Sequence, residues 1–556
     1  MLVYGDQVER IDPAEALRRL GEQRDGVLGM VPGLARHTAL STLFVDGAML
    51  LQGVADAAFA QGGCDDLRTV DRRLMGWLVE LGRALIVSWD SEFAGLARLP
   101  GLPALGPLPG EVELRTPEGY AFYALYPEAY AAAARSLNLS APPRVIGLRS
   151  IGTGLAAVVA AALDAPPPVT IRPHGDPFAR TLAIAPRLAA ALLDGSPHYV
   201  IVDEGPGLSG SSFGAVADWL EEHGVPRERI AFLPGHSNPL GPEAAAPHRA
   251  RWSKAQRPAV PPDELLADRL QQWVVHQVGA LSAPLQDISG GAWRSLRGTD
   301  ETIWPAVNPL WERRKFLAHT GCGSWLVKFA GLGRIGARKL DLSTRLHRAG
   351  FGAEPAGLAH GWLIERWHDD ARPARPNLDE LASYLALRRS FPAPSVGATP
   401  HSLLVMAHRN APEWLGDWSP DADRIAAAQR PVAIDGRMEA HEWLRRRSGQ
   451  LLKADALDHH AGHELIGCQD IAWDVAGAIV ELDLGSEDTE LLSRRLGVSP
   501  DLLDFHQRCY LAFRIGARRL GAAMLGHWPA EAARNIADAE RYERRLSALV
   551  NCIEHA

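Results

Sequence analysis

The sequence predicts an α/β protein of several domains, with a parallel sheet in the middle of the chain and a mixed α+β domain at its end. Two observations predict this. Between residues 111 and 245, short β-branched runs alternate with Ala-rich helical patterns, which is typical of βαβ units. After residue 286, two apolar runs flank a short turn and long helical patterns follow, which indicates an antiparallel hairpin followed by helices.

The composition narrows the classes of function. The chain has 58 Lys and Arg residues and 66 Asp and Glu residues, which gives a formal charge of −8. This acidic total argues against a protein that neutralises nucleic-acid phosphates. The five cysteines are far apart and form no CxxC pair, so we expect no disulfide framework and a reducing, cytoplasmic compartment. We found no secretory signal and no apolar stretch of about 20 residues, so we expect no membrane span. The expected partner is a small-molecule substrate; the oligomeric state is left open.

Composition shifts along the chain predict four segments. Residues 1–110 show helical periodicity and end in a stretch rich in Pro and Gly at 99–110, which we interpret as a linker. Residues 111–245 form the parallel-sheet domain, with predicted strands at 144–148, 169–172, 199–202 and 229–233. Residues 246–285 have little periodicity and are interpreted as a second linker before the α+β domain at 286–556.

The strongest motif is YVIVDEGPGLSGSS at 199–212, where a buried strand ends in two acids and a Gly-rich turn opens a helix. Glycines in such a turn let the backbone approach a ligand, and hydroxyls and N–H groups at a helix N-terminus favour a phosphate. The hydroxyls are those of Ser209, Ser211 and Ser212. Asp203 and Glu204 repel a phosphate but can accept hydrogen bonds from sugar hydroxyls.

This motif resembles the signature loop of the type I phosphoribosyltransferases, in which two acids and a short spacer precede Thr-Gly-x-Thr. Asp203 and Glu204 match the acids, and Ser209, Gly210 and Ser212 match the Thr-Gly-x-Thr positions, with Ser for Thr twice and a longer spacer. The resemblance implies that Asp203 and Glu204 orient the ribose of phosphoribosyl pyrophosphate. It also implies that Mg²⁺ neutralises the leaving pyrophosphate.

A second match lies upstream in the same order. The strand, tight loop and helix at 144–163 resemble the pyrophosphate loop of that family, which implies that the pyrophosphate is held by Arg149, Ser150, Ile151, Gly152 and Thr153. The segment 172–180 resembles the cover found between the two loops, with Arg172, His174 and Arg180 to balance charge. The alternatives are an ordinary Gly-rich turn of an α/β fold and, for 172–180, a solvated surface loop.

The second half holds a different set of motifs. Lys328 lies in a predicted strand at 325–330, and Lys is rare, with only five in the chain. A hinge-like run follows at 363–367, then LLKADALDHH at 451–460 and CQDIAWDVAG at 468–477. This order resembles the aminoglycoside phosphotransferase and choline kinase group of protein-kinase-like folds. The resemblance implies that Lys328 contacts ATP, that Asp455 is the catalytic acid and that Asp470 holds Mg²⁺.

Several positions depart from that group. Lys453 stands where the group has His, His460 stands where it has a metal-binding Asn, and the helix at 334–349 offers only Asp341 as a partner for Lys328. Asp474 is expected to order the catalytic loop. The alternatives are an amphipathic strand lysine for Lys328, and helix caps or salt bridges for the aspartates. The run of Asp458, His459, His460, His463 and Glu464 is expected to be a hydrated surface run rather than a zinc site.

These observations predict a phosphoribosyltransferase-like protein that transfers ribose 5-phosphate from phosphoribosyl pyrophosphate to an unknown acceptor, with Mg²⁺. One alternative is a small-molecule kinase that uses ATP at the C-terminal domain. The other is a catalytically silent ligand-sensing scaffold that keeps both folds.

Overall fold

The four apolar runs predicted as strands pair into one parallel sheet, in the order β4-β3-β7-β8. The structure is a computed structural model that describes residues 1–5, 8–195, 197–207, 209–241, 243–298 and 300–554. Buried on both faces, parallel strands are continuously apolar, which is why these runs were recognisable. The sheet strands are β3 (Pro143–Leu148), β4 (Val169–Ile171), β7 (His198–Val202) and β8 (Ile230–Leu233).

Helices cover this sheet, and the N-terminal helices belong to the same unit. A Cβ at Gly82 on α3 would meet the Cα of Val158 on α6 at 3.2 Å, so these two helices pack at close range. The helices of this half are α1 (Pro13–Leu28), α2 (Leu34–Gly62), α3 (Thr69–Asp90), α4 (Glu118–Phe122), α5 (Pro127–Arg135), α6 (Gly152–Ala162), α7 (Pro186–Leu193) and α8 (Ser211–Glu222). Residues 1–110 therefore share a core with the parallel-sheet unit.

Two short antiparallel pairs complete this half. One joins β1 (Val8–Ile11) to β2 (Val112–Arg115), and the other is the hairpin β5 (His174–Asp176) and β6 (Ala179–Thr181). The expected linker at 99–110 contains no helix or strand. The expected linker at 246–285 was wrong, since most of it folds as α9 (Ala246–Lys254) and α10 (Pro262–Val278), which bury Trp252 and Trp273.

The second half begins with a five-stranded antiparallel sheet in the order β12-β13-β11-β10-β9. Its strands are β9 (Gln286–Asp287), β10 (Lys315–Thr320), β11 (Gly323–Phe329), β12 (Pro355–Ala359) and β13 (Trp362–Trp367). The helix α11 (Gly333–Arg348) connects β11 to β12. A second sheet of three short strands, β14 (Arg372–Pro373), β15 (Trp443–Arg445) and β16 (Leu451–Lys453), faces the helical part.

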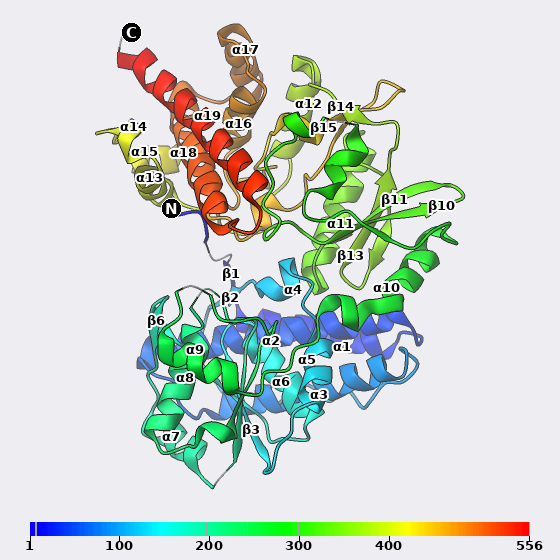
Figure 1. The fold of residues 1–556 in the computed structure, drawn as a ribbon, viewed down its shortest axis with the longest axis vertical. Helices are drawn as coiled ribbons and strands as arrows, with labels where there is room; N and C mark the ends of the chain where they lie inside the picture. The colour runs from blue at the N-terminus through cyan, green and yellow to red at the C-terminus, as the bar shows by residue number, and fades with distance from the viewer. Residues whose placement is uncertain (6–7, 196, 208, 242, 299, 555–556) are drawn as a thin grey trace.

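Helices form the remainder of this half (Figure 1). They are α12 (Leu378–Arg389), α13 (Pro400–Asn410), α14 (Pro412–Leu415), α15 (Ala422–Ala428), α16 (Ala472–Glu481), α17 (Ser486–Leu496), α18 (Pro500–Met524) and α19 (Pro529–Glu554). Single 3-10 turns lie at Arg227–Arg229, Ala292–Arg297, Glu301–Ile303, Ala440–Glu442 and His459–Ala461.

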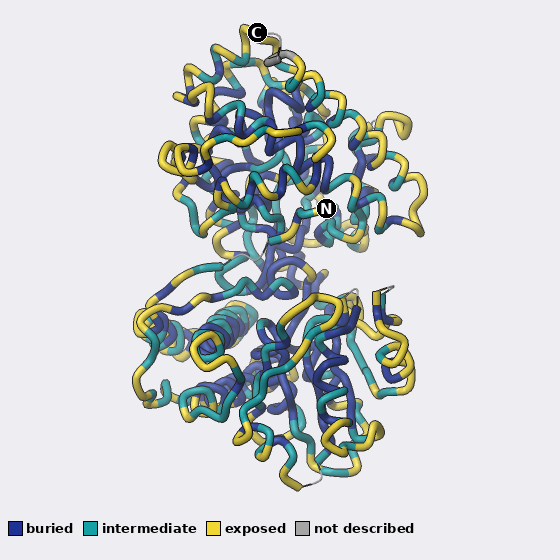
Figure 2. The backbone as a smooth tube through the Cα atoms, turned by 90° about the vertical axis from the view of Figure 1, so that its left-hand side faces the viewer, coloured by how far each residue is buried: buried dark blue, intermediate teal, exposed yellow. Residues whose placement is uncertain are grey.

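The two halves are joined by a buried waist (Figure 2). One hydrophobic cluster runs from α2, α3 and α6 of the first half into β11 and β13 of the second. The first residues of the chain also cross over, because Asn410 bonds both the backbone N–H and the carbonyl of Leu2. The two halves therefore bury apolar surface against each other and form a packed interface.

One expectation about membranes needs refinement. In the described part of the chain, α2 alone is long and apolar enough to cross a membrane, with 29 residues and a mean hydropathy of 1.4 in its most apolar stretch. The apolar stretch in α2 was not recognised from the sequence. In that stretch 61% of the residues are buried inside the protein, as in the core helix of a folded domain.

Candidate functional site

The two loops predicted to bind a sugar phosphate lie side by side in the first half. They follow β3 and β7, which are neighbouring parallel strands, so both loops emerge at the same edge of the sheet. A Cβ at Gly152 would meet Asp203 Oδ1 at 3.5 Å. The starts of the two predicted loops, at Gly152 and Asp203, therefore lie close together.

The acids of this edge sit in a poorly solvated place. Glu204 Oε2 accepts the backbone N–H of Gly119 at 2.9 Å, and the hydroxyl of Tyr130 donates to the carbonyl of Asp203 at 2.8 Å. Burial raises the pKa of Asp203 to about 7 and the pKa of Glu204 to about 8. At neutral pH this pair carries less negative charge than two solvated carboxylates.

The arginines of this region are already paired. Arg149 bonds Asp56 at 2.8 Å and also pairs with Asp65, and Arg172 pairs with Asp56. Asp56 lies in the last two turns of α2 and Asp65 just beyond its end, and neither was noticed in the sequence. Arg149 thus points toward buried carboxylates, so the prediction that its side chain faces a pyrophosphate does not match this arrangement.

The hydroxyls at the start of α8 are partly covered. Gly210 has φ of 62° and forms the N-cap, where a side chain would be strained. The segment 172–180 forms the β5–β6 hairpin rather than an irregular loop, and its Pro177 carbonyl accepts Ser211 Oγ at 2.7 Å, with Ser209 Oγ at 3.1 Å. Ser212 lies half-buried beside them, while Ser150, Ile151 and Thr153 open α6, where Thr153 is fully buried.

The second half contains a more open group of charged side chains. Lys328 on β11 reaches across to the chain that follows β16, where its Nζ pairs with Asp455 and lies 2.6 Å from Asp458 Oδ2. Burial alone would lower the pKa of Lys328, but the two carboxylates outweigh it and raise the pKa above its usual value. The same lysine holds the pKa values of both aspartates well below their usual range, against the opposing effect of burial.

Two cavities meet at this ion-pair network. One extends toward α18 and α19, and the other lies between the five-stranded sheet and the β15–β16 hairpin. The residues common to both linings are Trp293, Glu312, Lys315, Lys328, His441, Glu442 and Asp455. Four of the five lysines surround this place, because Lys453 lines the second cavity and Lys339 pairs with Asp458.

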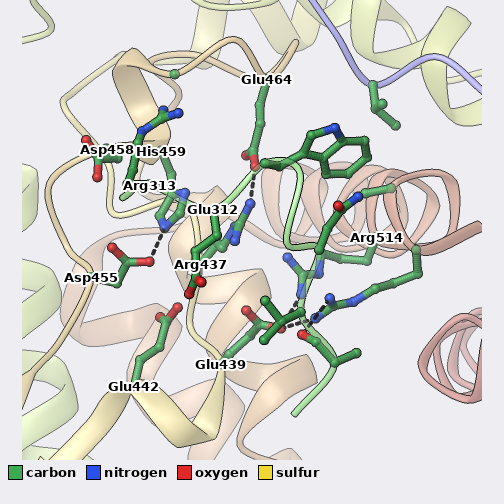
Figure 3. Close-up of a pocket in the computed structure, with 18 of the residues that line it drawn as sticks. Glu312, Arg313, Arg437, Glu439, Glu442, Asp455, Asp458, His459, Glu464 and Arg514 are labelled. Carbon is green, nitrogen blue, oxygen red and sulfur yellow. Dashed lines mark hydrogen bonds and ion pairs between the residues drawn. The ribbon is translucent and has the colours of Figure 1, made fainter. Parts of the chain in front are cut away.

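One group of side chains in the first cavity offers donors for a cation (Figure 3). Ligand atoms of Glu442, Asp455 and His459 lie within 4.8 Å of one another. Burial lowers the pKa of His459 to about 4, so its ring is neutral at neutral pH. The two carboxylates suit Mg²⁺, which prefers oxygen, whereas an imidazole suits a transition metal better.

Several assignments made from the sequence are not supported by the positions of the residues. Asp470 lines neither cavity; it accepts the backbone N–H groups of Ala472 and Arg430 at 2.9 and 2.8 Å, which matches the helix-cap alternative. His460 lines a separate cavity beside α11. Asp341 is 71% exposed and faces Arg345 on its own helix, so it does not pair with Lys328.

The histidine run at 459–463 is not a hydrated surface run. His459, His460 and His463 are only 8%, 5% and 8% exposed. Burial lowers the pKa of His460 to about 3 and that of His463 to about 4, which keeps both rings neutral. The polar residue types suggested exposure, but aromatic rings from distant segments bury at least His463, because Phe122 and Tyr4 pack on its ring.

Asp474 was expected to order the loop around Asp455, but the loop that it holds lies earlier in the chain. Its carboxylate accepts the backbone N–H groups of Asp435 and Gly436 at 2.7 and 2.8 Å, and so holds the loop that precedes β15. Asp435 itself is fully buried and bonds the Tyr384 hydroxyl and Lys453 Nζ. This carboxylate is enclosed by the protein and does not open onto the cavity.

Sequence reasoning gave no role to Lys339, Glu439 and Glu442, and it assigned Asp458 to a hydrated surface run rather than to this network. The rarity of lysine was a usable signal, because it marks almost every cation of the network. The acids carried no such signal, since Asp and Glu are common throughout the chain. Glu439 pairs with Arg514 and Arg518 from α18, and no local sequence pattern predicts this contact.

Comparisons with known proteins give partial likenesses only. No family model matches the chain. A CRISPR-associated DNA-binding protein Cas12m from Pelobacter propionicus is 34% identical over 108 residues, 19% of this chain, and the match spans only 14% of that relative.

Solved structures similar to part of the chain are small-molecule kinases. They include the choline kinase LicA from Streptococcus pneumoniae, with 12% identity over 51% of this chain and 99% of that one, at a TM-score of 0.31. A choline/ethanolamine kinase family protein from Mesorhizobium loti has 14% identity over 51% and 99%, at 0.32. The aminoglycoside phosphotransferase APH(4)-Ia has 13% identity over 50% and 99%, at 0.29. TM-scores of this size do not establish a shared fold.

Proposed function

We propose that the second half binds a nucleotide together with a divalent cation, and that the chain is of the small-molecule phosphotransferase type. The observation that carries the proposal is the placement of Lys328, which stands at the junction of two cavities opposite Asp455 and Asp458. Phosphoryl transfer depends on positioned cations around the phosphates. A strand lysine facing metal-binding acids supplies that combination.

The cavity between the sheet and the β15–β16 hairpin suits a nucleoside. Its walls are apolar side chains from both layers, and it ends in the charged group around Lys328. The apolar wall residues include Leu326, Leu346, Leu444 and Leu452. Ligand sites commonly combine an apolar pocket with a few convergent polar groups. A base in the apolar part places its phosphates at the lysine.

The chain order assigns roles that differ from those inferred from the sequence. In kinases the catalytic loop precedes the metal-binding Asp. Here the loop held by Asp474 precedes the β15–β16 hairpin, and Asp455 follows it. We therefore assign Asp455, with Glu442, to the cation, which supplies charge neutralisation when bound. Asp435, the acid of the preceding loop, is enclosed by Lys453 and Tyr384, so we expect transfer to be slow and nucleotide binding to outlast it.

Titration calorimetry of the full chain with ATP and Mg²⁺ tests the proposal. Binding should be lost on Lys328→Met and weakened on Asp455→Asn. Lys254→Met is the matched control, because Lys254 is exposed on α9 and is the one lysine outside the network. No ATP binding by the wild-type chain, or equal loss in the control, contradicts the proposal.

A second candidate function is favoured by the edge of the parallel sheet. Two predicted loops meet there, with two acids beside hydroxyls at the start of α8, which fits a ribose phosphate such as phosphoribosyl pyrophosphate. The paired Arg149 and the covering β5–β6 hairpin mean that binding requires this hairpin to move. Titration with phosphoribosyl pyrophosphate and Mg²⁺ is the test. Binding weakened by Asp203→Asn with Glu204→Gln supports it, and binding of neither ligand supports a silent scaffold.

A further inference from the structure

A cluster of two histidines and one glutamate lies at the waist, away from both candidate sites. His37 comes from α2, Glu128 from α5 and His360 from the turn between β12 and β13. Their exposed fractions are 0%, 2% and 0%. The first two belong to the first half and the third to the second half, so the cluster spans the junction. None of the three lines a cavity described above.

The free donor atoms of the cluster face one another. Ligand atoms of all three side chains lie within 4.8 Å of one another, and His37 Nε2 is 3.1 Å from Glu128 Oε1. His37 Nε2 and Glu128 Oε1 thus pair with each other, whereas His360 Nε2 and Glu128 Oε2 are buried without a hydrogen-bond partner. Buried polar groups are nearly always satisfied, so two such atoms beside a buried ion pair need an explanation.

The other ring nitrogens are held by hydroxyl groups. His37 Nδ1 is 3.0 Å from Ser88 Oγ, and His360 Nδ1 is 3.4 Å from Thr38 Oγ1. These contacts fix the ring orientations; His37 Nε2 faces Glu128, and His360 Nε2 keeps no hydrogen-bond partner. An outer hydrogen bond on the second ring nitrogen is the usual arrangement for a histidine that ligates a metal.

The cluster has apolar surroundings, in which the negative charge of Glu128 needs a compensating positive charge. Rings of Trp89, Phe93, Tyr126 and Trp273 pack around the two histidines. An ionised Glu128 in this setting requires a cation, which is either a protonated His37 or a bound metal.

We propose that His37, Glu128 and His360 bind one divalent transition-metal ion that ties the two halves together. Two imidazoles and a carboxylate form a donor set used for zinc and for iron. Donors of one zinc ion, bonded at about 2.0–2.2 Å, lie roughly 3–4 Å apart. The cluster therefore needs only a small contraction. This site is structural and independent of nucleotide binding.

The test uses the full chain. After treatment with a chelator and dialysis, the protein is titrated with Zn²⁺ and with Co²⁺, and bound metal is counted by mass spectrometry. We expect one tight equivalent and a rise in the thermal midpoint. The Co²⁺ spectrum should show nitrogen and oxygen ligation without a thiolate charge-transfer band, which separates this site from the cysteines.

Two variants and one control complete the metal-binding test. Glu128→Gln keeps the shape of the side chain, and His360→Asn suits a backbone with φ of 43°, which Asn tolerates well. Both should lose the tight equivalent, while His506→Asn should keep it, because His506 is equally buried but lies outside the cluster. No tight equivalent in the wild type, or retention in both variants, overturns the proposal and leaves a protonated His37 as the partner of Glu128. Should the variants fail to fold, an unchanged midpoint of the wild type on adding Zn²⁺ overturns it equally.

Discussion

Replacing Lys328 by Met removes a cation that pairs with both Asp455 and Asp458. Its Nζ lies 2.6 Å from Asp458 Oδ2, where unit charges attract by about 6 kcal/mol at an effective dielectric constant of about 20. Desolvation of the two ions offsets several kcal/mol of this attraction. The net value of the network is therefore much smaller than the attraction itself.

The expected loss of stability depends on how well Asp455 and Asp458 are compensated after Lys328 is removed. Asp458 keeps Lys339 as a partner, and the side chain of Asp455 is 37% exposed, so water solvates it in part. Leaving one uncompensated buried charge costs about 3–5 kcal/mol. We therefore expect Lys328→Met to lower the free energy of unfolding of the second half by about 2–3 kcal/mol, somewhat below that range.

The assay is denaturant unfolding followed by tryptophan fluorescence at several pH values, with Lys254→Met as the control. Because Lys328 depresses the pKa values of Asp455 and Asp458, their stabilisation is present above the unfolded pKa of about 3.9 and is lost as the pH falls below it. The difference between wild type and variant should be complete at pH 7 and shrink below about pH 4. A loss no larger than that of the control, or one that is unchanged at low pH, refutes this reasoning.

Three further predictions follow from the contacts described. Asp474→Ala leaves two buried N–H groups without an acceptor and should cost about 2–4 kcal/mol in unfolding, whereas the exposed Asp417→Ala should cost almost nothing. The raised pKa values of Asp203 and Glu204 mean that these two groups bind more protons in the folded than in the unfolded state, so their contribution to stability should fall as the pH rises from about 4 to about 8; Asp203→Asn with Glu204→Gln should therefore gain stability relative to the wild type over this range, and a difference that does not change with pH contradicts the assignment. Ser212→Asp should weaken binding of ribose 5-phosphate by placing an anion at the start of α8 while leaving the thermal midpoint nearly unchanged, and unaltered binding by calorimetry contradicts a phosphate site there.

Strands and the long amphipathic helix were predictable because their patterns are local. The four buried runs became β3, β4, β7 and β8, the hairpin became β10 and β11, and the helix expected at 334–349 is α11. The helices at 246–285 were missed because Pro and Arg dilute their periodicity, and only the burial of Trp252 and Trp273 against distant segments reveals their apolar faces.

The candidate site was predictable only in part. Lys328 and Asp455 are indeed together, as the motif order indicated. Asp470 was assigned to a cation because it heads a conspicuous motif, yet that prominence reflects a helix cap. The pairing of Asp458 with Lys328 and the place of Glu442 could not be predicted, since they depend on how β16 and the loop before β15 approach β11 in three dimensions.

The lysines are concentrated around one place, so most of the side-chain amines of this chain lie in a single region. An amine-selective acylating reagent has only five side chains to modify, and four of them report on a single site. Burial lowers the pKa of Lys339 to about 8, whereas Asp455 and Asp458 hold Lys328 as an unreactive ammonium. Labelling with and without ATP, followed by peptide mapping, therefore tests occupancy of the proposed nucleotide site against the exposed Lys254 as reference.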